Sequence, residues 1–194
     1  MIQQKSSFAE KVSISTQKSL GGVGSLLVFL NFMPGMGMLF GIIGVILWLI
    51  SIYQIGSKIK KPEIFNKVII SFTLEVLAWT IALTFGLMSL IGFFAFSGFI
   101  GEEERLSFSM GIGVFIALLV AYLISIVSAY FYKEAYKILA SATNHNLFST
   151  AGLFMYIGAI TLILFGIGFI IRIVGWIILA VAFFTAPDEV EVRT

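Results

Sequence analysis

The sequence contains no cysteine and a single histidine, His145. Without cysteine, the chain cannot form a disulfide framework, a thiolate metal site, an iron–sulfur cluster or a cysteine nucleophile. Charged residues are also scarce, at 11 % of the 194 residues, whereas a soluble domain carries roughly 25 %. Such a chain cannot cover a surface that faces water, so the composition excludes an ordinary soluble domain.

Apolar residues take the place of the missing charges. They make up 59 % of the chain, which includes twenty phenylalanines, and the mean hydropathy is +1.07. The net charge of +2 is too small to suggest a nucleic-acid partner. We therefore expect membrane lipids to surround the protein and no nucleic acid to bind it.

The charged residues cluster and divide the chain into segments. A polar tail is expected at residues 1–18, a single helical membrane domain at 19–186 and an acidic tail at 187–194. Within the membrane domain, uninterrupted apolar blocks run over 19–56, 68–100, 108–132 and 147–186. The fold class predicted is all-α, a polytopic helical membrane protein.

The block lengths predict about six transmembrane segments. A crossing needs about 20 apolar residues, which suits one helix for each of the two middle blocks. The outer blocks are nearly twice that length, so each should fold back on itself. The predicted hairpins are 19–56, 68–132 and 147–186. The arms of the outer two are short, which leaves open a re-entrant variant in which they do not reach the far side.

Glycine and proline mark where the outer hairpins should turn. Pro34 and Gly35 interrupt the first block, and Gly166 and Gly168 interrupt the last. These residues disfavour a continuous helix.

The lysines predict how the chain is threaded. In a six-crossing arrangement all nine lysines lie on one side, and the opposite loop holds Glu102, Glu103, Glu104 and Arg105. Because positive loops face the cytoplasm, we expect a multi-pass protein of the cell membrane with both termini cytoplasmic.

The two outer hairpins match each other at an offset of 131 residues. Gly21, Gly35, Gly37 and Gly44 fall on Gly152, Gly166, Gly168 and Gly175. Both copies would enter from the same side, which predicts a parallel repeat about an axis along the membrane normal. Chance similarity in a glycine-rich chain is the alternative.

Small residues at helical spacing indicate where helices pack closely in a membrane. One such stripe is Gly113, Ala117, Ala121 and Ser125, and another is Gly37, Gly41 and Gly44. We expect both to pack within the molecule, with a homodimer face as the alternative.

Glu75 and Arg172 are the two charges that interrupt the apolar blocks, and they are the candidate intramembrane functional residues. Ionisable groups in a membrane are costly and mark functional sites by default. Side chains lean toward the N-terminus of their helix, so Glu75 should lean inward and Arg172 outward. This argues against a direct ion pair and predicts that Arg172 is an interfacial anchor. For Glu75, structural burial is expected, with a proton or cation pathway as the alternative.

Catalytic and cofactor motifs are not recognisable. The sequence shows no metal-ligand spacing, acidic prenyl or phosphate motif, or phosphate-binding loop between a strand and a helix. We predict no catalytic residue, cofactor or metal site, and treat the chain as a non-enzyme.

Several segments resemble a known family. They are residues 19–25 (SLGGVGS), 131–136 (FYKEAY), 147–152 (LFSTAG) and 174–180 (VGWIILA). Together they resemble the small, mostly archaeal multi-spanning membrane proteins catalogued as domain of unknown function 996. The resemblance implies a membrane protein, hints at an archaeal source and carries no established activity.

The function that this sequence favours is a structural or accessory subunit of a larger membrane assembly, for example a respiratory complex. Its partners would then be other membrane protein subunits. The alternative is a small transporter or channel that uses Glu75. A water-filled cavity reaching Glu75 would favour the alternative.

Overall fold

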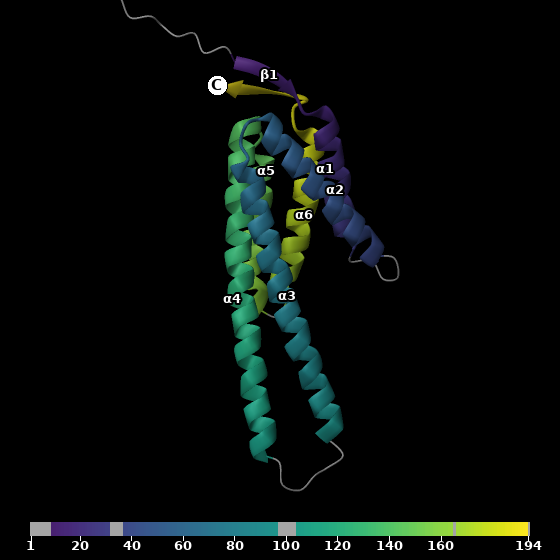
Figure 1. Ribbon diagram of the computed structural model, residues 1–194, viewed down its shortest axis with the longest axis vertical. Coiled ribbons are helices and arrows are strands. Elements are labelled where there is room, and N and C mark those ends of the chain that lie inside the picture. The colour runs from purple at the N-terminus through teal and green to yellow at the C-terminus, as the bar shows by residue number, and fades with distance from the viewer. Residues whose placement is uncertain (1–8, 32–36, 97–103, 165, 194) are drawn as a thin grey trace, which may run out of the picture.

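A computed structural model describes residues 9–31, 37–96, 104–164 and 166–193. The first half contains β1 (Ala9–Ser13), α1 (Ser15–Leu30), α2 (Gly37–Lys58) and α3 (Glu63–Phe96). The second half contains α4 (Glu104–Thr143), α5 (Leu147–Ile160), a 3-10 turn at Thr161–Ile163, α6 (Ile167–Thr185) and β2 (Glu189–Arg193). The fold is thus an all-α helical membrane protein closed by a small strand pair, as Figure 1 shows.

Three antiparallel helical hairpins, α1–α2, α3–α4 and α5–α6, build the molecule. α1 packs against α6 and α4 packs against α5, so the third hairpin lies between the other two. Four helices are long and apolar enough to cross a membrane: Gly37–Lys58, Glu63–Met88, Ile112–Thr143 and Ile167–Thr185. α1 and the segment Leu147–Ile163 are shorter than a full crossing, in keeping with the short arms expected for the outer hairpins.

The middle hairpin is much longer than its neighbours. α3 has 34 residues and α4 has 40, against 14 in α5 and 19 in α6. α3 and α4 therefore project well beyond the tip of the α5–α6 hairpin (Figure 1). We call this projecting part, α3 after Ala82 and α4 before Leu118, the arm.

The two tails meet in a strand pair that sequence analysis did not anticipate. β1 pairs antiparallel with β2, with Ala9 opposite Arg193 and Ser13 opposite Glu189. Val190 and Val192 are buried, whereas Glu189 and Glu191 are exposed. Alternation of apolar and polar residues is the signature of a half-buried strand. This pairing brings the described ends of the chain to the same end of the molecule.

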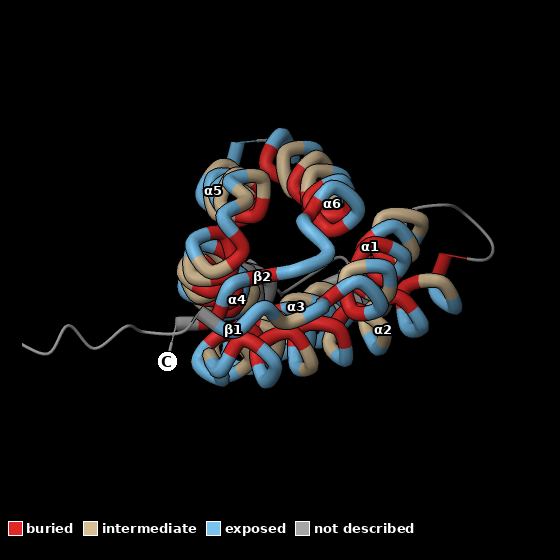
Figure 2. Tube along the Cα trace, turned by 90° about the horizontal axis from the view of Figure 1, so that it is seen from above, coloured by how far each residue is buried: buried red, intermediate tan, exposed pale blue. Residues whose placement is uncertain are grey.

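The best-packed core lies under the strand pair. Trp48 and Tyr136 are fully buried there, and the ring centroid of Trp48 lies 5.8 Å from that of Tyr132 and 5.4 Å from that of Trp176. Viewed along the helices from this end, the buried residues lie on the sides of the helices that face one another (Figure 2). The rings join α2, α4 and α6, so the three hairpins are held together most firmly at this end.

The outer hairpins repeat the same close contacts at the offset of 131 residues. In the first hairpin, the Cα of Gly44 lies against the backbone of Gly24. In the third, Gly175 lies against Met155, and these two positions are 131 residues later in each case. Gly37 against Asn31 and Gly168 against Leu162 form a second equivalent pair. The repeat read from the sequence is therefore also a repeat of helix contacts.

The glycine stripe of α2 lies on its contact with α1. Gly37, Gly41 and Gly44 are all buried, and a Cβ on Gly44 would meet the backbone of Val28 and Gly24. The close approach of the two backbones explains why side chains are missing there.

The α4 stripe divides into two parts. Ala117, Ala121 and Ser125 are buried. Gly113 lies on the arm, is exposed, and a Cβ there would meet no atom within 4 Å in the described part of the chain. Its assignment to the packed face was wrong, because the arm extends past the other hairpins at that level.

One of the predicted turns is well described. Gly166 precedes α6 with a φ of 82°, which glycine adopts without strain. Gly168 is not a turn residue: it lies in the first turn of α6, packed against Gly158 and Leu162. The expectation for Gly168 was therefore wrong. Pro34 and Gly35 lie outside the described residues.

Candidate functional site

Glu75 of α3 and Arg172 of α6 form an ion pair inside the apolar part of the molecule. A terminal guanidinium nitrogen of Arg172 (Nη2) lies 2.7 Å from Oε1 of Glu75, and each side chain is 15 % exposed. A pair this well shielded interacts more strongly than one on a protein surface in water. The two charges neutralise each other, so neither stands alone in the membrane.

Neighbouring polar groups complete the surroundings of the pair. The indole of Trp79 donates to Oε1 of Glu75 at 3.2 Å, and the hydroxyl of Ser128 lies 3.0 Å from Oε2. Arg172 donates through Nη1 to the hydroxyl of Ser125 at 3.3 Å. Both carboxylate oxygens of Glu75 are therefore bonded, which offsets the cost of burying the charge.

Two serines link α3 to α4 just beside the ion pair. Ser71 donates to the carbonyl of Ser128, and the Ser128 hydroxyl lies 2.8 Å from the carbonyl of Ser71. Both residues are fully buried. Their reciprocal arrangement sets the register of the two helices and thereby the position of Glu75.

The prediction that Glu75 and Arg172 do not pair was wrong. It placed Arg172 near the far membrane surface because it follows the hairpin tip by one turn. The tip itself lies part-way along α3 and α4, since α5 and α6 are much shorter. Arg172 is consequently level with Glu75, and its long side chain spans the remaining gap. Arg172 is a partner of Glu75 and not an interfacial anchor.

A cavity of about 150 Å³ adjoins the ion pair. The residues that line it come from α3, α4, the 3-10 turn and α6: Glu75, Ala78, Trp79, Ala82, Leu118, Ala121, Tyr122, Ser125, Leu162 and Arg172. Most of its wall is apolar, and the polar groups gather at the end formed by the ion pair. The arrangement suits a small ligand with one polar part.

Sequence reasoning missed three residues of this site. Trp79 lies four residues after Glu75 and Ser71 lies four before it, a spacing that places all three on one helix face. This signal was available in the sequence. Tyr122 donates to the carbonyl of Ile160 at 2.6 Å, and only the tertiary structure shows that contact.

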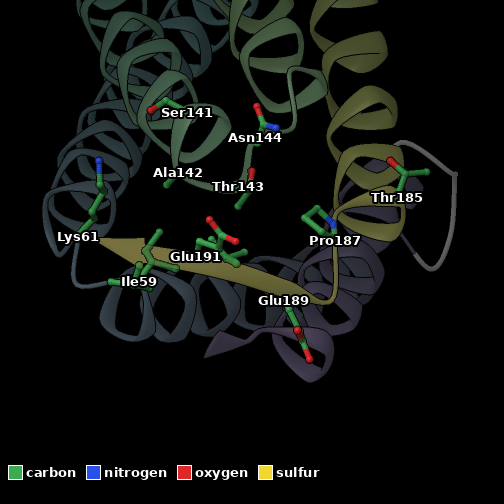
Figure 3. Close-up of a pocket in the computed structure, with 12 residues that line it drawn as sticks. Ile59, Lys61, Ser141, Ala142, Thr143, Asn144, Thr185, Pro187, Glu189 and Glu191 are labelled. Carbon is green, nitrogen blue, oxygen red and sulfur yellow. The ribbon is translucent and has the colours of Figure 1, made fainter. Parts of the chain in front are cut away.

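A second, larger cavity lies under the strand pair. Its volume is about 1060 Å³, and its wall includes Lys61, Asn144, Thr185 and Glu191. Figure 3 shows it between the ends of α4 and α6 and the strand β2. The two cavities share no lining residue, so together they do not form a route along the molecule.

Ionic contacts attach the C-terminal segment to the helices. Lys18 Nζ lies 2.8 Å from Asp188 and 2.7 Å from the carbonyl oxygen of Ala186. The lysine lowers the pKa of the Asp188 carboxyl by hydrogen bonding and by its charge. His145, in the turn after α4, bonds the hydroxyl of Thr185 at 2.9 Å. No group of three acidic or histidine side chains in the described residues is placed to hold a metal ion.

Comparison with known proteins places the chain among relatives. A model of the family described as proteins of unknown function (DUF996) matches residues 40–177. The chain belongs to this family. The matched region includes Glu75, Arg172 and every other residue of the intramembrane site. No function is recorded for the family, so the site itself must supply the functional argument.

A relative of this DUF996 protein is the uncharacterized protein MJ1644 of Methanocaldococcus jannaschii. It is 28 % identical over 185 residues, which cover 93 % of this chain and 97 % of the relative. The two proteins therefore share almost their full length, and an archaeal source fits the resemblance seen in the sequence. No solved structure matches.

Proposed function

We propose that the protein is an accessory subunit of a larger membrane assembly, without catalytic chemistry of its own. The arm formed by α3 and α4 carries this proposal. Gly86 on α3 and Gly113 on α4 lie on it, and a Cβ at either would meet nothing within 4 Å in the described chain. Glycines let helices approach closely in a membrane, which suits docking of another membrane helix.

The bonding of the ion pair supports the same proposal. Glu75 is neutralised by Arg172 and bonded by Trp79 and Ser128. A carboxylate that carries protons or cations must exchange partners, whereas here three groups hold it in place. The bonds join α3, α4 and α6, so the site serves well as an internal brace for the hairpins.

The depth of the hairpin tips bears on how the protein is inserted. Ala82 of α3 and Leu162 near the tip of the third hairpin line the same cavity. α3 continues from Ala82 to Phe96, or about 21 Å at 1.5 Å per residue, and its sequence there is entirely uncharged. The tip therefore lies at hydrocarbon depth, and we propose that the α5–α6 hairpin is re-entrant.

The composition of the tip agrees with a position in lipid. Ile163, Leu164 and Ile167 are exposed there. Backbone groups in lipid must be bonded internally, and the N–H groups of Leu164 and Ile167 donate to Thr161 and Leu164 at 2.9 and 3.1 Å. Every lysine in the described residues lies toward the strand-pair end. By the positive-inside rule, we propose that this end is cytoplasmic and that the host is the cell membrane.

Co-purification tests the accessory role. The tagged protein would be extracted from its native membrane in mild detergent, alongside a variant in which Gly113→Leu and Gly86→Leu make the arm bulky. We expect a stoichiometric membrane partner with the parent and its loss with the variant. Phe115→Leu, an exposed position on the same arm, is the matched control and should retain the partner. A parent protein that purifies alone would contradict the proposal.

A transporter or channel that uses Glu75 remains the second candidate, because a cavity does reach this residue. Reconstituted liposomes with a pH gradient separate the two. An accessory subunit should produce no flux above that of empty liposomes. A flux that is abolished when Glu75→Gln is combined with Arg172→Met, which removes both charges together, would favour the transporter.

A further inference from the structure

We propose that the cavity beside Glu75 and Arg172 binds a neutral, ring-sized group that bears a hydroxyl or carbonyl oxygen and enters from the lipid phase. This role is separate from the proposed docking of the arm. It rests on the walls of the cavity, its polar end, its charge balance and its size.

The walls are made for an apolar guest. Three alanines, Ala78, Ala82 and Ala121, leave the space that larger side chains would fill, and Leu118 and Leu162 complete the apolar surface. Leu118 and Trp79 are 44 % and 49 % exposed, so the cavity lies at the outer surface of the bundle. In a membrane that surface faces lipid, which makes lipid the route of entry.

The polar end can bond an oxygen atom. The guanidinium of Arg172 has five N–H donors, and among the described residues it bonds only Glu75 and Ser125. Donors are therefore left for a ligand. Tyr122 uses its proton on the carbonyl of Ile160, so its hydroxyl oxygen is able to accept a hydrogen bond from a ligand hydroxyl.

The charge balance selects a neutral group. Glu75 already neutralises Arg172 at 2.7 Å. An anionic head group would be repelled by the carboxylate, and a cationic one by the guanidinium. A neutral hydroxyl or carbonyl meets neither penalty and satisfies the donors that remain.

The volume sets the size of the guest. An apolar protein cavity of about 150 Å³ is large enough to hold benzene, and the cavity here has about this volume. One substituted six-membered ring fits, while a tail on the ring would extend into the lipid. The site thus suits the head of a lipid-soluble phenol or quinone.

Three brominated rings of nearly equal size test the proposal: 4-bromophenol, 4-bromobenzoate and bromobenzene. Bromine quenches tryptophan fluorescence on contact, and Trp79 lines the cavity. The full chain would be titrated in lipid vesicles at neutral pH, with each probe expressed as its membrane concentration. We expect saturable quenching by 4-bromophenol and at least about tenfold weaker binding of the other two, a difference of about 1.4 kcal/mol. The saturable component should vanish in Trp79→Phe.

Two variants on α3 locate the binding site. Ala82→Leu fills the cavity and should raise the dissociation constant of 4-bromophenol at least about tenfold, because core space does not admit extra groups. Val76→Leu adds bulk at an exposed position outside the cavity and should leave binding unchanged. Circular dichroism verifies folding, and should Ala82→Leu not fold, Ala82→Val takes its place. Linear quenching by all three rings, equal binding by both variants, or tightest binding of 4-bromobenzoate would each overturn the proposal.

Discussion

Arg172 lies 2.7 Å from Glu75 although 96 residues separate them in the chain. The pair joins the middle hairpin to the third one at the level where the third hairpin ends. It also forms the polar end of the intramembrane cavity. Its integrity should therefore control both the stability of the bundle and any ligand binding in the cavity.

Removing one member of the pair should be costly. Glu75→Gln leaves the Arg172 charge without its partner in a site where each side chain is 15 % exposed. Breaking a buried pair in this way costs about 3–5 kcal/mol. Adding Arg172→Met should restore most of the loss, because the unpaired charge is then gone. Unfolding in mixed detergent micelles measures both values, and a stable single variant would show that the pair contributes little.

Glycine-to-alanine substitutions should rank by the space around each position. Gly44→Ala meets the backbone of Val28 and Gly24 and should destabilise the fold by about 1–3 kcal/mol. Gly175→Ala meets the flexible side chain of Met155 first and should cost less. Gly113→Ala meets nothing in the described chain and should be neutral or slightly stabilising. Thermal unfolding in detergent gives the order, and an equal loss at all three positions would contradict the contacts.

Cysteine labelling should report the threading of the chain. A cysteine at Ser6 and one at Ser107 are expected to react with a water-soluble maleimide from opposite sides of the membrane. A cysteine at Leu164, on the hairpin tip, should react from neither side if the hairpin is re-entrant. Ready labelling of Leu164→Cys from the side that labels Ser107→Cys would instead show a full crossing. The absence of native cysteine makes each single label unambiguous.

The strand pair should loosen in acid. Because Lys18 lowers the pKa of Asp188 in the folded state, the contact is fully stabilising above the usual value of 3.8. It is lost as the pH falls through the lowered pKa. Amide hydrogen exchange of β2 should accelerate over that range in the parent protein. Asp188→Asn should exchange faster already at neutral pH and show less dependence on pH, and identical profiles would rule out the contact.

Hydrophobicity and glycine spacing were enough to predict most of the architecture. The apolar blocks predicted hairpins, and the turn after α4 was evident from its run of polar residues, Asn144 to Asn146. The equivalence of Gly44 and Gly175 was readable as an offset and reappears as equivalent helix contacts. These features are local or periodic, so each can be inferred without knowing where distant segments lie.

The site itself could only be partly predicted. Glu75 and Arg172 stood out as charges in apolar blocks, but their pairing depended on the relative lengths of α3, α4, α5 and α6. Ser128 extends the small-residue stripe of α4, yet its contact with Glu75 needed the register of two helices. Gly113 lies on that stripe and is exposed, because nothing in a stripe shows how far the neighbouring hairpins extend.

The sequence by itself determined that the protein is embedded in a membrane, since an uncharged helix is solvated by lipid whatever its neighbours are. It also determined the three hairpins and the repeat, which follow from residue spacing along the chain. Only the tertiary structure decided that the third hairpin ends level with Glu75, that Arg172 neutralises this residue, and that the tails form a strand pair. Those features depend on the tilt, length and packing of segments far apart in the chain, where small differences in helix length decide which side chains meet.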